Sequence, residues 1–448
     1  MAPEERRVVV IGGGMAAARL VQRLGAAARP GLALTVIGEE PCAPYNRVLL
    51  AEVLAGRYAP EVIALPEPAA AFRRGVRALR VDRADRVVLC DDGQRIPYDT
   101  LVLATGSNPV LPALRGLGHG GLSDGRCPDG RCPDGGLPEG VHPFRTLADC
   151  RALATAACPG VRAVVIGGGL LGVSAARGLA ERGVQVVLVQ QGERLMERQL
   201  DAGAAELLHD HLTGLGVEVH TQCRVRGLRT EVAGAAPGTA AVSAARATSA
   251  AATAADASAA PAVRGVILAD GYELAADLVV LACGVRPRTG LATAAGLTVR
   301  TGVVVDDTLR TCDPRIHAIG DCAEHRGVVY GLAGPALEQA DVLADHLTGR
   351  PARYTGTRAL TRLTLNGSGP LDLAAFGETD PAPGDEVIRL SDATRRAYRK
   401  VVVRGDRLVG GILLGDLAAV GALARAWEGD EPLPSTPPLH LLTTDGGC

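Results

Sequence analysis

The sequence predicts an α/β fold in which two similar units, each with a parallel sheet, are joined to a smaller third unit. Residues 8–17 (VVVIGGGMAA) recur in altered form at residues 161–172 (VRAVVIGGGLLG), about 150 positions later. In each copy an apolar run rich in β-branched residues predicts a buried parallel strand, and the glycines after it predict a sharp turn into a helix. The length of 448 residues agrees with about three domains of roughly 150 residues each.

The first copy carries the complete pattern of a dinucleotide-binding turn. Gly12 makes the turn, and Gly14 lacks a side chain, so that a pyrophosphate can approach the backbone at the positive N-terminus of the helix. Ala17 permits close packing of the helix against the strand. A second strand is predicted at residues 34–37 and is followed by Glu39, where an acid binds ribose hydroxyls. This pattern predicts a Rossmann-like domain.

The second copy repeats the pattern with Gly167, Gly169 and Gly172, and it predicts a second Rossmann-like domain. Its next strand, predicted at residues 184–189, ends at Gln190, which replaces the usual acid. An amide can hydrogen-bond a ribose hydroxyl, but it does not repel a 2′-phosphate as a carboxylate does. The sequence therefore does not decide whether the nucleotide is NADH or NADPH.

The C-terminal part has a different pattern. Alternating runs at residues 400–403 and 408–414 predict strands, and a helix is predicted over residues 417–427, which together indicate a small α+β domain. Two stretches rich in small residues, 116–144 and 233–262, have no hydrophobic period and are predicted to be low-complexity loops.

Composition narrows the class of protein. The 47 basic and 49 acidic residues give a formal charge of −2, which argues against a nucleic-acid partner, and aromatic residues make up only 2% of the chain. No run of about 18 apolar residues is present to span a membrane. The N-terminal apolar stretch is assigned to the nucleotide turn rather than to a signal peptide, because no small-residue cleavage site follows it. We therefore expect a cytoplasmic protein with no membrane contact.

The cysteines and histidines suggest neither a disulfide framework nor a metal site. Eleven cysteines without regular spacing are typical of reduced thiols in a cytosolic enzyme. Cys127 and Cys132 have the spacing of some redox pairs, but they lie in a duplicated stretch (DGRCPDGRCPDGG) that predicts a surface loop. Cys42 is predicted to be a plain loop cysteine. His209 and His211 are two residues apart on a predicted helix and point to different faces, so no metal is expected.

Three further segments end predicted strands in small-residue turns: residues 101–106 (LVLATG), 278–284 (LVVLACG) and 316–322 (IHAIGDC). In this order, the motifs resemble the pyridine nucleotide-dependent flavoprotein reductases, in which an NAD(P) domain is inserted in an FAD domain. The resemblance covers about 340 residues. It implies FAD at the first copy and NAD(P)H at the second.

The resemblance also implies domain boundaries and site residues. The expected domains are an FAD domain (1–115 and 285–345), an NAD(P) domain (145–284) and a C-terminal interface domain (350–430). The residues assigned to FAD are Gly12, Gly14, Ala17, Glu39, Arg47, Thr105, Gly106, Arg145, Gly320 and Asp321, and those assigned to NAD(P)H are Gly167, Gly169, Gly172, Gln190 and Gly284. Glu39 would bind the adenosine ribose, and Gly320 with Asp321 would hold the ribityl chain.

A narrower similarity appears in residues 39–50 (EEPCAPYNRVLL), 185–200 and 408–416. These segments are similar to the N-terminal flavin module of the large subunit of assimilatory NAD(P)H-nitrite reductase. That enzyme continues into iron-sulfur and sirohaem regions, which need about four clustered cysteines per iron-sulfur cluster, and this chain has no such cluster. We therefore expect only the electron-accepting part, with an iron-sulfur, sirohaem or molybdenum subunit as its redox protein acceptor. A homodimer is left open.

Two positions depart from the pattern of the relatives. Glu52 stands where related ferredoxin reductases have a lysine close to the flavin, and Ser174 stands where relatives usually have a glutamate. Neither member of the lysine-glutamate pair found beside the nicotinamide in many relatives is therefore present. Glu52 is predicted to be a solvated helix residue rather than a catalytic one.

The function implied is that of an FAD-dependent NAD(P)H oxidoreductase that passes electrons to an iron-sulfur or haem protein in nitrite or nitrate assimilation. Hydride transfer between stacked rings requires no protein acid or base, so no catalytic residue is assigned. Two alternatives stay open. One is an NAD(P)H-dependent ferredoxin or rubredoxin reductase, and the other is a flavin-binding redox sensor or assembly protein without turnover.

Overall fold

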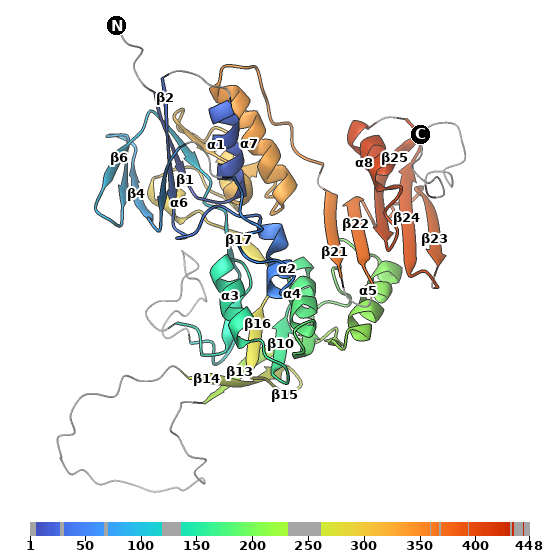
Figure 1. Cartoon of the computed structure of the whole chain (residues 1–448). Coiled ribbons are helices and arrows are strands. Elements are labelled where there is room, and N and C mark those ends of the chain that lie inside the picture. The colour runs from blue at the N-terminus through green and yellow to red at the C-terminus, as the bar shows by residue number, and fades with distance from the viewer. Residues whose placement is uncertain are drawn as a thin grey trace, which may run out of the picture.

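The structure is a computed structural model, and it describes residues 6–26, 31–66, 70–118, 136–231, 261–358, 360–366, 369–392, 394–430, 432–433 and 442. Two α/β units lie one above the other, and an antiparallel C-terminal domain lies beside them (Figure 1). Cys127, Cys132 and nearly all of the stretch 233–262 fall outside the described residues. The two parallel sheets and the third domain confirm the predicted fold class.

The first unit is a five-stranded parallel sheet in the order β19-β7-β1-β2-β3. Its main elements are β1 (Arg6–Ile11), α1 (Met15–Ala26), β2 (Leu32–Gly38), β3 (Ala71–Arg74), β7 (Thr100–Leu103), β19 (Ile316–Ala318) and α7 (Ala333–Leu347). The strands form because their apolar runs are covered on both faces, and Val8, Val9 and Val10 are almost wholly inaccessible. Helices α1 and α7 lie side by side, and Arg19 pairs with Asp341 across them at 2.7 Å (Figure 1).

Shorter elements complete the first unit. They are η1 (Arg47–Leu49), α2 (Leu50–Leu54), β4 (Ala78–Asp82), β5 (Val87–Cys90), β6 (Arg95–Pro97), α6 (Gly290–Ala294), β18 (Val303–Val305), η2 (Gly320–Cys322) and β20 (Ala323–His325). Strands β4, β5 and β6 form a small antiparallel sheet, and β18 pairs with β20.

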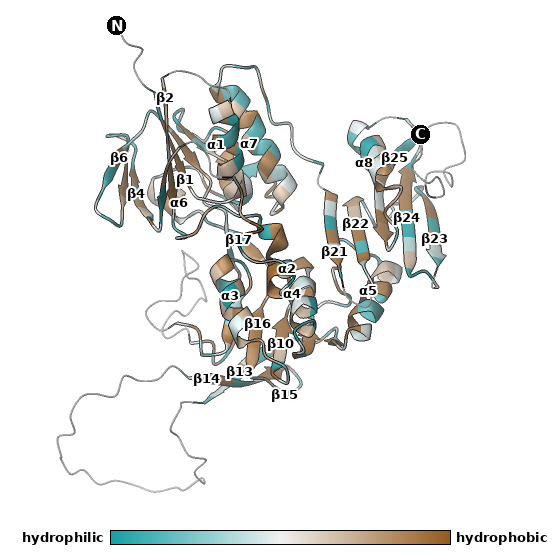
Figure 2. Cartoon of the chain, viewed as in Figure 1, coloured by the Kyte–Doolittle hydropathy of each residue, from teal (hydrophilic) through white to brown (hydrophobic). Residues whose placement is uncertain are grey.

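The second unit is a five-stranded parallel sheet in the order β12-β11-β10-β16-β9. Its elements are β9 (Val141–Pro143), α3 (Leu147–Ala156), β10 (Arg162–Ile166), α4 (Leu170–Ala180), β11 (Gln185–Val189), α5 (Ala202–Gly214), β12 (Glu218–His220) and β16 (Leu278–Leu281), with an antiparallel sheet of β13 (Val225–Glu231), β14 (Ala262–Leu268) and β15 (Glu273–Ala275). The central strands β10 and β16 are largely hydrophobic (Figure 2), with an exposed Arg162 at the start of β10. On α5, His211 is buried while His209 is more exposed, as the spacing predicts.

The predicted loop at residues 116–144 is wrong at its C-terminal end. Residues 141–143 form β9, which pairs with β16 and extends the second sheet, and Val141 is 3% exposed. A three-residue strand containing a histidine and a proline carries no hydrophobic period, so it cannot be recognised from local pattern. Its burial comes from the neighbouring strand.

Two short strands connect the units. The chain leaves the first unit through β8 (Ser107–Pro109) and returns through β17 (Val285–Pro287), and these strands pair antiparallel with each other. The second unit is therefore inserted in the first, as expected. This insertion places the ends of the strands of both parallel sheets at the junction between the two units.

The C-terminal domain is a five-stranded antiparallel sheet in the order β21-β22-β25-β24-β23 with one helix against it. Its elements are β21 (Leu360–Leu365), β22 (Leu371–Gly377), β23 (Glu386–Asp392), β24 (Ala397–Arg404), β25 (Arg407–Leu414) and α8 (Val420–Gly429). Phe376 packs against Trp427 with ring centroids 5.1 Å apart, which holds α8 on the sheet. The two predicted strand runs lie inside β24 and β25, and the helix begins three residues later than predicted.

The C-terminal domain is attached to the second unit by a buried polar contact. Asp201 caps the N-terminus of α5, and its carboxylate also accepts hydrogen bonds from the Tyr398 hydroxyl at 2.6 Å and from Lys400 Nζ at 2.8 Å. Burial alone would raise the pKa of Asp201, but these donors outweigh it and lower the pKa. In the described part of the chain, no helix is long and apolar enough to cross a membrane.

Candidate dinucleotide-binding site

The first glycine-rich turn leaves open space in front of its helix. Gly12 has φ +121°, and a Cβ there would lie 2.0 Å from the carbonyl oxygen of Ala104 at the end of β7. This position therefore requires glycine. A Cβ added at Gly14 would meet nothing within 4 Å, and Gly14 lies at the start of α1, where amide groups face outward. A phosphate can approach these amides.

The second turn repeats this geometry. Gly167 has φ +111°, and a Cβ there would lie 2.5 Å from the carbonyl oxygen of Ala282, at the end of β16. Gly169 caps α4 and has open space around it. A Cβ at Gly172 would come within 1.7 Å of the Gly167 carbonyl oxygen, so the third glycine permits the close helix packing predicted for it.

One cavity of about 1730 Å³ connects the two turns. Ligand pockets commonly measure about 300–1,000 Å³, so this cavity has room for more than one cofactor of ordinary size. It is lined by all the predicted site residues except Ala17 and Gly172, which pack beneath the turns. The structure therefore brings together residues drawn from strand ends between positions 12 and 321 of the sequence.

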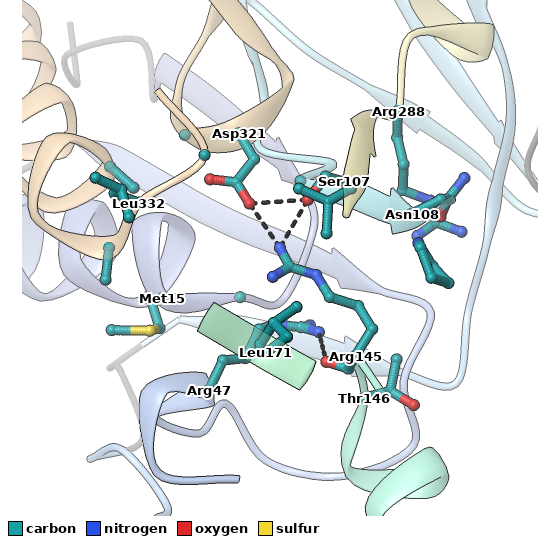
Figure 3. A pocket seen from close by; sticks show the side chains of 18 of the residues that line it. Met15, Arg47, Ser107, Asn108, Arg145, Thr146, Leu171, Arg288, Asp321 and Leu332 are labelled. Carbon is teal, nitrogen blue, oxygen red and sulfur yellow. Dashed lines mark hydrogen bonds and ion pairs between the residues drawn. The ribbon is translucent and has the colours of Figure 1, made fainter. Parts of the chain in front are cut away.

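Arg145 and Asp321 form the polar centre of the cavity wall. Arg145 Nη2 lies 2.6 Å from Asp321 Oδ2 and 2.7 Å from Ser107 Oγ, and the Ser107 hydroxyl donates to Asp321 at 2.8 Å (Figure 3). Burial lowers the pKa of the Arg145 guanidinium, and the Asp321 carboxylate opposes this effect. Arg145 Nε is buried and has no hydrogen-bond partner in the described structure, so it is a donor available to a ligand.

Arg47 supports the same wall from η1. Its Nη1 donates to the Arg145 carbonyl oxygen at 3.0 Å, as Figure 3 shows, and its Nη2 lies 2.5 Å from Glu40 Oε1. The Tyr45 hydroxyl donates to the other Glu40 oxygen at 2.8 Å and accepts from the Leu147 amide at 2.9 Å. Burial raises the pKa of Tyr45, which keeps this hydroxyl protonated. These contacts fix the positions of α3 and η1 relative to each other.

The acid after the first turn and the amide after the second are held differently. Glu39 lies 2.8 Å from Arg288 Nη2, and the Arg288 backbone is fixed by contacts to Thr105 and Gly106. Gln190 turns back toward its own turn, where its Oε1 accepts from the Gly168 amide at 2.8 Å. The predicted ribose contacts of both side chains stay predictions.

Several residues that line the site were missed from sequence. Ser107 directly follows the predicted Gly106 on β8, whereas Arg288 comes just after β17, and both gain their role from the pairing of those two strands. Leu332 and Ala333 place the N-terminus of the 15-residue helix α7 at the cavity (Figure 3 labels Leu332). Only Ser107 had a signal in the sequence, which is its place next to the predicted turn at Gly106.

The cavity also contains two thiols, Cys42 and Cys283. Burial raises the pKa of Cys42, and it raises the pKa of Cys283 to about 11, so both are protonated at neutral pH. No group of three or more metal-ligating side chains occurs among the residues that the structure describes. These cysteines therefore lack the lowered pKa of a reactive thiolate.

The prediction for Glu52 is wrong. Its side chain is 13% exposed, and its Oε1 lies 2.5 Å from Arg177 Nη2 on α4. The Ser174 hydroxyl instead donates to the Leu170 carbonyl oxygen of its own helix at 2.7 Å. The partner of Glu52 is therefore Arg177, which lies three residues after Ser174 on α4.

Comparison with known families agrees with this geometry. Residues 6–340 match the pyridine nucleotide-disulphide oxidoreductase family. The chain belongs to this family. Membership implies FAD and NAD(P)H as cofactors and assigns the chain to the NAD(P)H-dependent FAD oxidoreductases. Residues 363–428 match the rubredoxin NAD⁺ reductase C-terminal domain. Open space at Gly14 and Gly169 and the unpartnered Arg145 Nε agree with cofactors at these positions.

Two curated relatives come from Bacillus subtilis (strain 168). An NAD(P)H nitrite reductase is 31% identical over 445 residues, which are 98% of this chain and 49% of the relative. An assimilatory nitrate reductase electron transfer subunit is 32% identical over 420 residues, which are 92% of this chain and 48% of the relative. This chain thus spans about half the length of these curated relatives.

Solved structures extend the similarity to the whole fold. A ferredoxin reductase from Rhodopseudomonas palustris has a TM-score of 0.75 and 26% identity, with 95% of each chain covered. The covalent putidaredoxin reductase–putidaredoxin complex has a TM-score of 0.77 and 22% identity, with 100% of each chain covered. The second likeness concerns the fold alone.

Proposed function

We propose that this member of the family takes a hydride from NAD(P)H onto FAD and passes electrons to an iron-sulfur or haem protein acceptor in nitrite or nitrate assimilation. The observation that carries the proposal is the single cavity shared by both glycine-rich turns. Hydride transfer requires the two reacting rings in contact. A shared cavity permits this, whereas two separate pockets would not.

The first unit supplies most of the FAD contacts in this proposal, and Arg145, between β9 and α3, adds one from the second unit. The amides after Gly14 face a pyrophosphate at the positive end of α1, and Glu39 accepts from a ribose while Arg288 holds its carboxylate. Asp321 accepts from ribityl hydroxyls, and Arg145 orients that carboxylate and donates from Nε. Bound FAD would accept a hydride and release electrons singly, which suits a one-electron metal centre.

The second unit supplies the NAD(P)H contacts. Gly167 and Gly169 allow a pyrophosphate to approach the start of α4, and Gln190 lies where the ribose would be. Gly284 has φ +100° and no atom within 4 Å of an added Cβ, so its backbone is open to the cavity. These residues bind and orient the nucleotide, and none is required to carry a proton.

The two relatives from Bacillus subtilis favour the nitrite or nitrate pathway. One is named as a nitrite reductase, and the other is named as the electron transfer subunit of an assimilatory nitrate reductase. Both aligned regions extend over more than nine-tenths of this chain, including the C-terminal domain. An iron-sulfur, sirohaem or molybdenum subunit is therefore the acceptor we propose first.

A ferredoxin or rubredoxin reductase is the second candidate. It is favoured by the match of residues 363–428 to the rubredoxin NAD⁺ reductase C-terminal domain and by the similarity to the Rhodopseudomonas palustris ferredoxin reductase. This candidate shares the chemistry at FAD and differs only in the protein that receives the electrons.

Stopped-flow mixing of the purified, FAD-loaded chain with NADH and with NADPH tests the shared step. We expect bleaching of the flavin absorbance with at least one nucleotide, and no bleaching with either would overturn both reductase proposals and favour a sensor without turnover. Steady-state assays then compare sirohaem nitrite reductase, nitrate reductase, ferredoxin and rubredoxin as acceptors. Nitrite reduction by this chain alone would contradict the proposed transfer to a separate acceptor.

A further inference from the structure

A buried ionic network lies behind the cavity, where α2 of the first unit meets α4 of the second. Arg177 is 1% exposed, and its guanidinium contacts Glu52 at 2.5 Å and Glu181 at 3.2 Å. Arg57 closes the network from the exposed side, with its Nε 2.8 Å from Glu181. Arg177 Nε is buried with no hydrogen-bond partner in the described structure, so this cation is held by its two carboxylates alone.

The two helices are also in close backbone contact at this point. A Cβ added at Gly178 would lie 3.2 Å from the Ala51 carbonyl oxygen and 3.3 Å from the Leu54 side chain. Just after the C-terminal end of α4, Arg182 Nη1 donates to the Leu54 carbonyl oxygen at 3.4 Å. The two helices are therefore in close contact through small residues, and the charged side chains lie beside this contact.

Both helices reach the cavity at their N-terminal ends. On α4, Gly169 is the N-cap residue, and Leu171 and Ser174 line the cavity one turn later. On α2, Leu50 and Ala51 line the same cavity. Glu52 and Arg177 do not line it, so they cannot touch a bound cofactor. They instead join α2 of the first unit to α4, the helix that begins at the second glycine-rich turn.

Stability alone does not account for such a pair. Replacing a buried ion pair by well-packed apolar side chains is often neutral or stabilising, whereas removing one partner is costly because it leaves an uncompensated charge. A buried ion pair can instead contribute by selecting one geometry, as it does in some proteins. Here that geometry joins the two units whose ligands must react.

We propose that Glu52 and Arg177 form an interdomain brace that positions the nicotinamide ring against the flavin for hydride transfer. The inference rests on the proposed function. Both are positioning residues, because they act through α2 and α4. A displacement of about 1 Å at a reacting centre can slow a reaction on the order of 100-fold, so a small shift between these helices is enough to matter.

The primary test is stopped-flow reduction of FAD-loaded E52Q at saturating NAD(P)H. We expect the rate of flavin reduction to fall on the order of 10- to 100-fold, while the Kd of the nucleotide changes by less than about threefold. The long-wavelength absorbance of stacked flavin and nicotinamide should weaken in parallel. The matched control is R162Q, which breaks the exposed Arg162–Asp277 pair within the second unit and should keep the wild-type rate. A wild-type rate in E52Q would overturn the brace.

A double variant separates positioning from folding. E52L/R177M removes both charges, so no buried charge is left unpaired, and Glu181 keeps Arg57 as its partner. We expect its thermal midpoint to return close to that of the wild type while hydride transfer stays slow. A wild-type rate in this variant would overturn the proposal even if E52Q did not fold. Because wild-type bleaching tests the proposed function and the ratio of variant to wild-type rates tests the brace, the two failures are distinguishable.

Discussion

In the first unit, Gly12 packs under the carbonyl oxygen of Ala104, and in the second unit Gly167 packs under that of Ala282 in the same way. The side chains beyond these turns differ. The first unit places an acid, Glu39, against Arg288, whereas the second turns the amide of Gln190 back onto its own loop. The backbone that receives a pyrophosphate is thus repeated, while the groups that meet the rest of the ligand have diverged.

The largest effect is expected from a substitution at the third position of the glycine-rich turn, where the two units differ. The first unit has Ala17 there, and the second has Gly172, where a Cβ would lie 1.7 Å from a backbone oxygen. We expect G172A to destabilise the second unit by several kcal/mol and to abolish reduction by NAD(P)H while FAD stays bound. Denaturant unfolding and stopped-flow reduction measure both effects.

The reciprocal change is the control for that prediction. A17G creates no clash, so it should cost only about 1 kcal/mol through helix propensity and backbone entropy. Normal reduction by NAD(P)H in G172A would show that the second turn is not built as the structure has it.

The second prediction concerns the buried pair that Arg145, just before α3 of the second unit, forms with Asp321 of the first unit, and the two side chains are 15% and 14% exposed. D321N leaves the Arg145 charge without its counter-ion, which we expect to destabilise the FAD site by about 3 kcal/mol and to release FAD on dialysis. D277N is the matched change in the second unit. It breaks an exposed pair and should cost less than about 1 kcal/mol. Equal FAD retention by the two variants would contradict this difference.

The strand, turn and helix of each unit could be predicted because they depend on local pattern, namely an apolar run followed by glycines at fixed spacing. Convergence of Thr105 and Asp321 on one cavity could also be predicted, since they follow β7 and β19 of the same sheet and the carboxyl ends of parallel strands share one edge. These predictions used only residues that lie at the ends of strongly apolar strands.

Other features could not be predicted because they depend on neighbours distant in sequence. Strand β9 is recognisable only by its pairing with β16, and Glu52 is buried only because α4 supplies Arg177 from 125 residues away. Likewise, nothing local distinguishes a Gln190 side chain that faces a ribose from one that caps Gly168. The structure at these positions is determined by tertiary contacts, and each contact depends on the residues of both partners.

The third prediction concerns the stability of the first unit at acid pH. Burial and the neighbouring His346 lower the pKa of His317, on β19 of the first sheet, to about 4. Because the unfolded chain binds this proton near pH 6.5, the stabilising effect is complete above pH 6.5 and is lost as the pH falls toward 4. We expect wild type to lose about 2 kcal/mol between pH 7 and pH 5 from this group. Urea unfolding should show a flatter profile in H317Q, and an unchanged pH dependence would contradict the assignment.

The smallest expected effect concerns Gln190, the position where the second unit has an amide and the first unit has the acid Glu39. In Q190E, a carboxylate can keep the hydrogen bond from the Gly168 amide and add a charge that repels a 2′-phosphate. We expect the ratio of NADH to NADPH affinity to rise about tenfold, or about 1.4 kcal/mol, in stopped-flow titrations. E39Q, the matched change in the first unit, should weaken FAD retention and leave that ratio unchanged, because Glu39 pairs with Arg288 on the other side of the cavity. If E39Q moved the nucleotide preference and Q190E did not, the order of the two cofactors along the chain would have to be reversed.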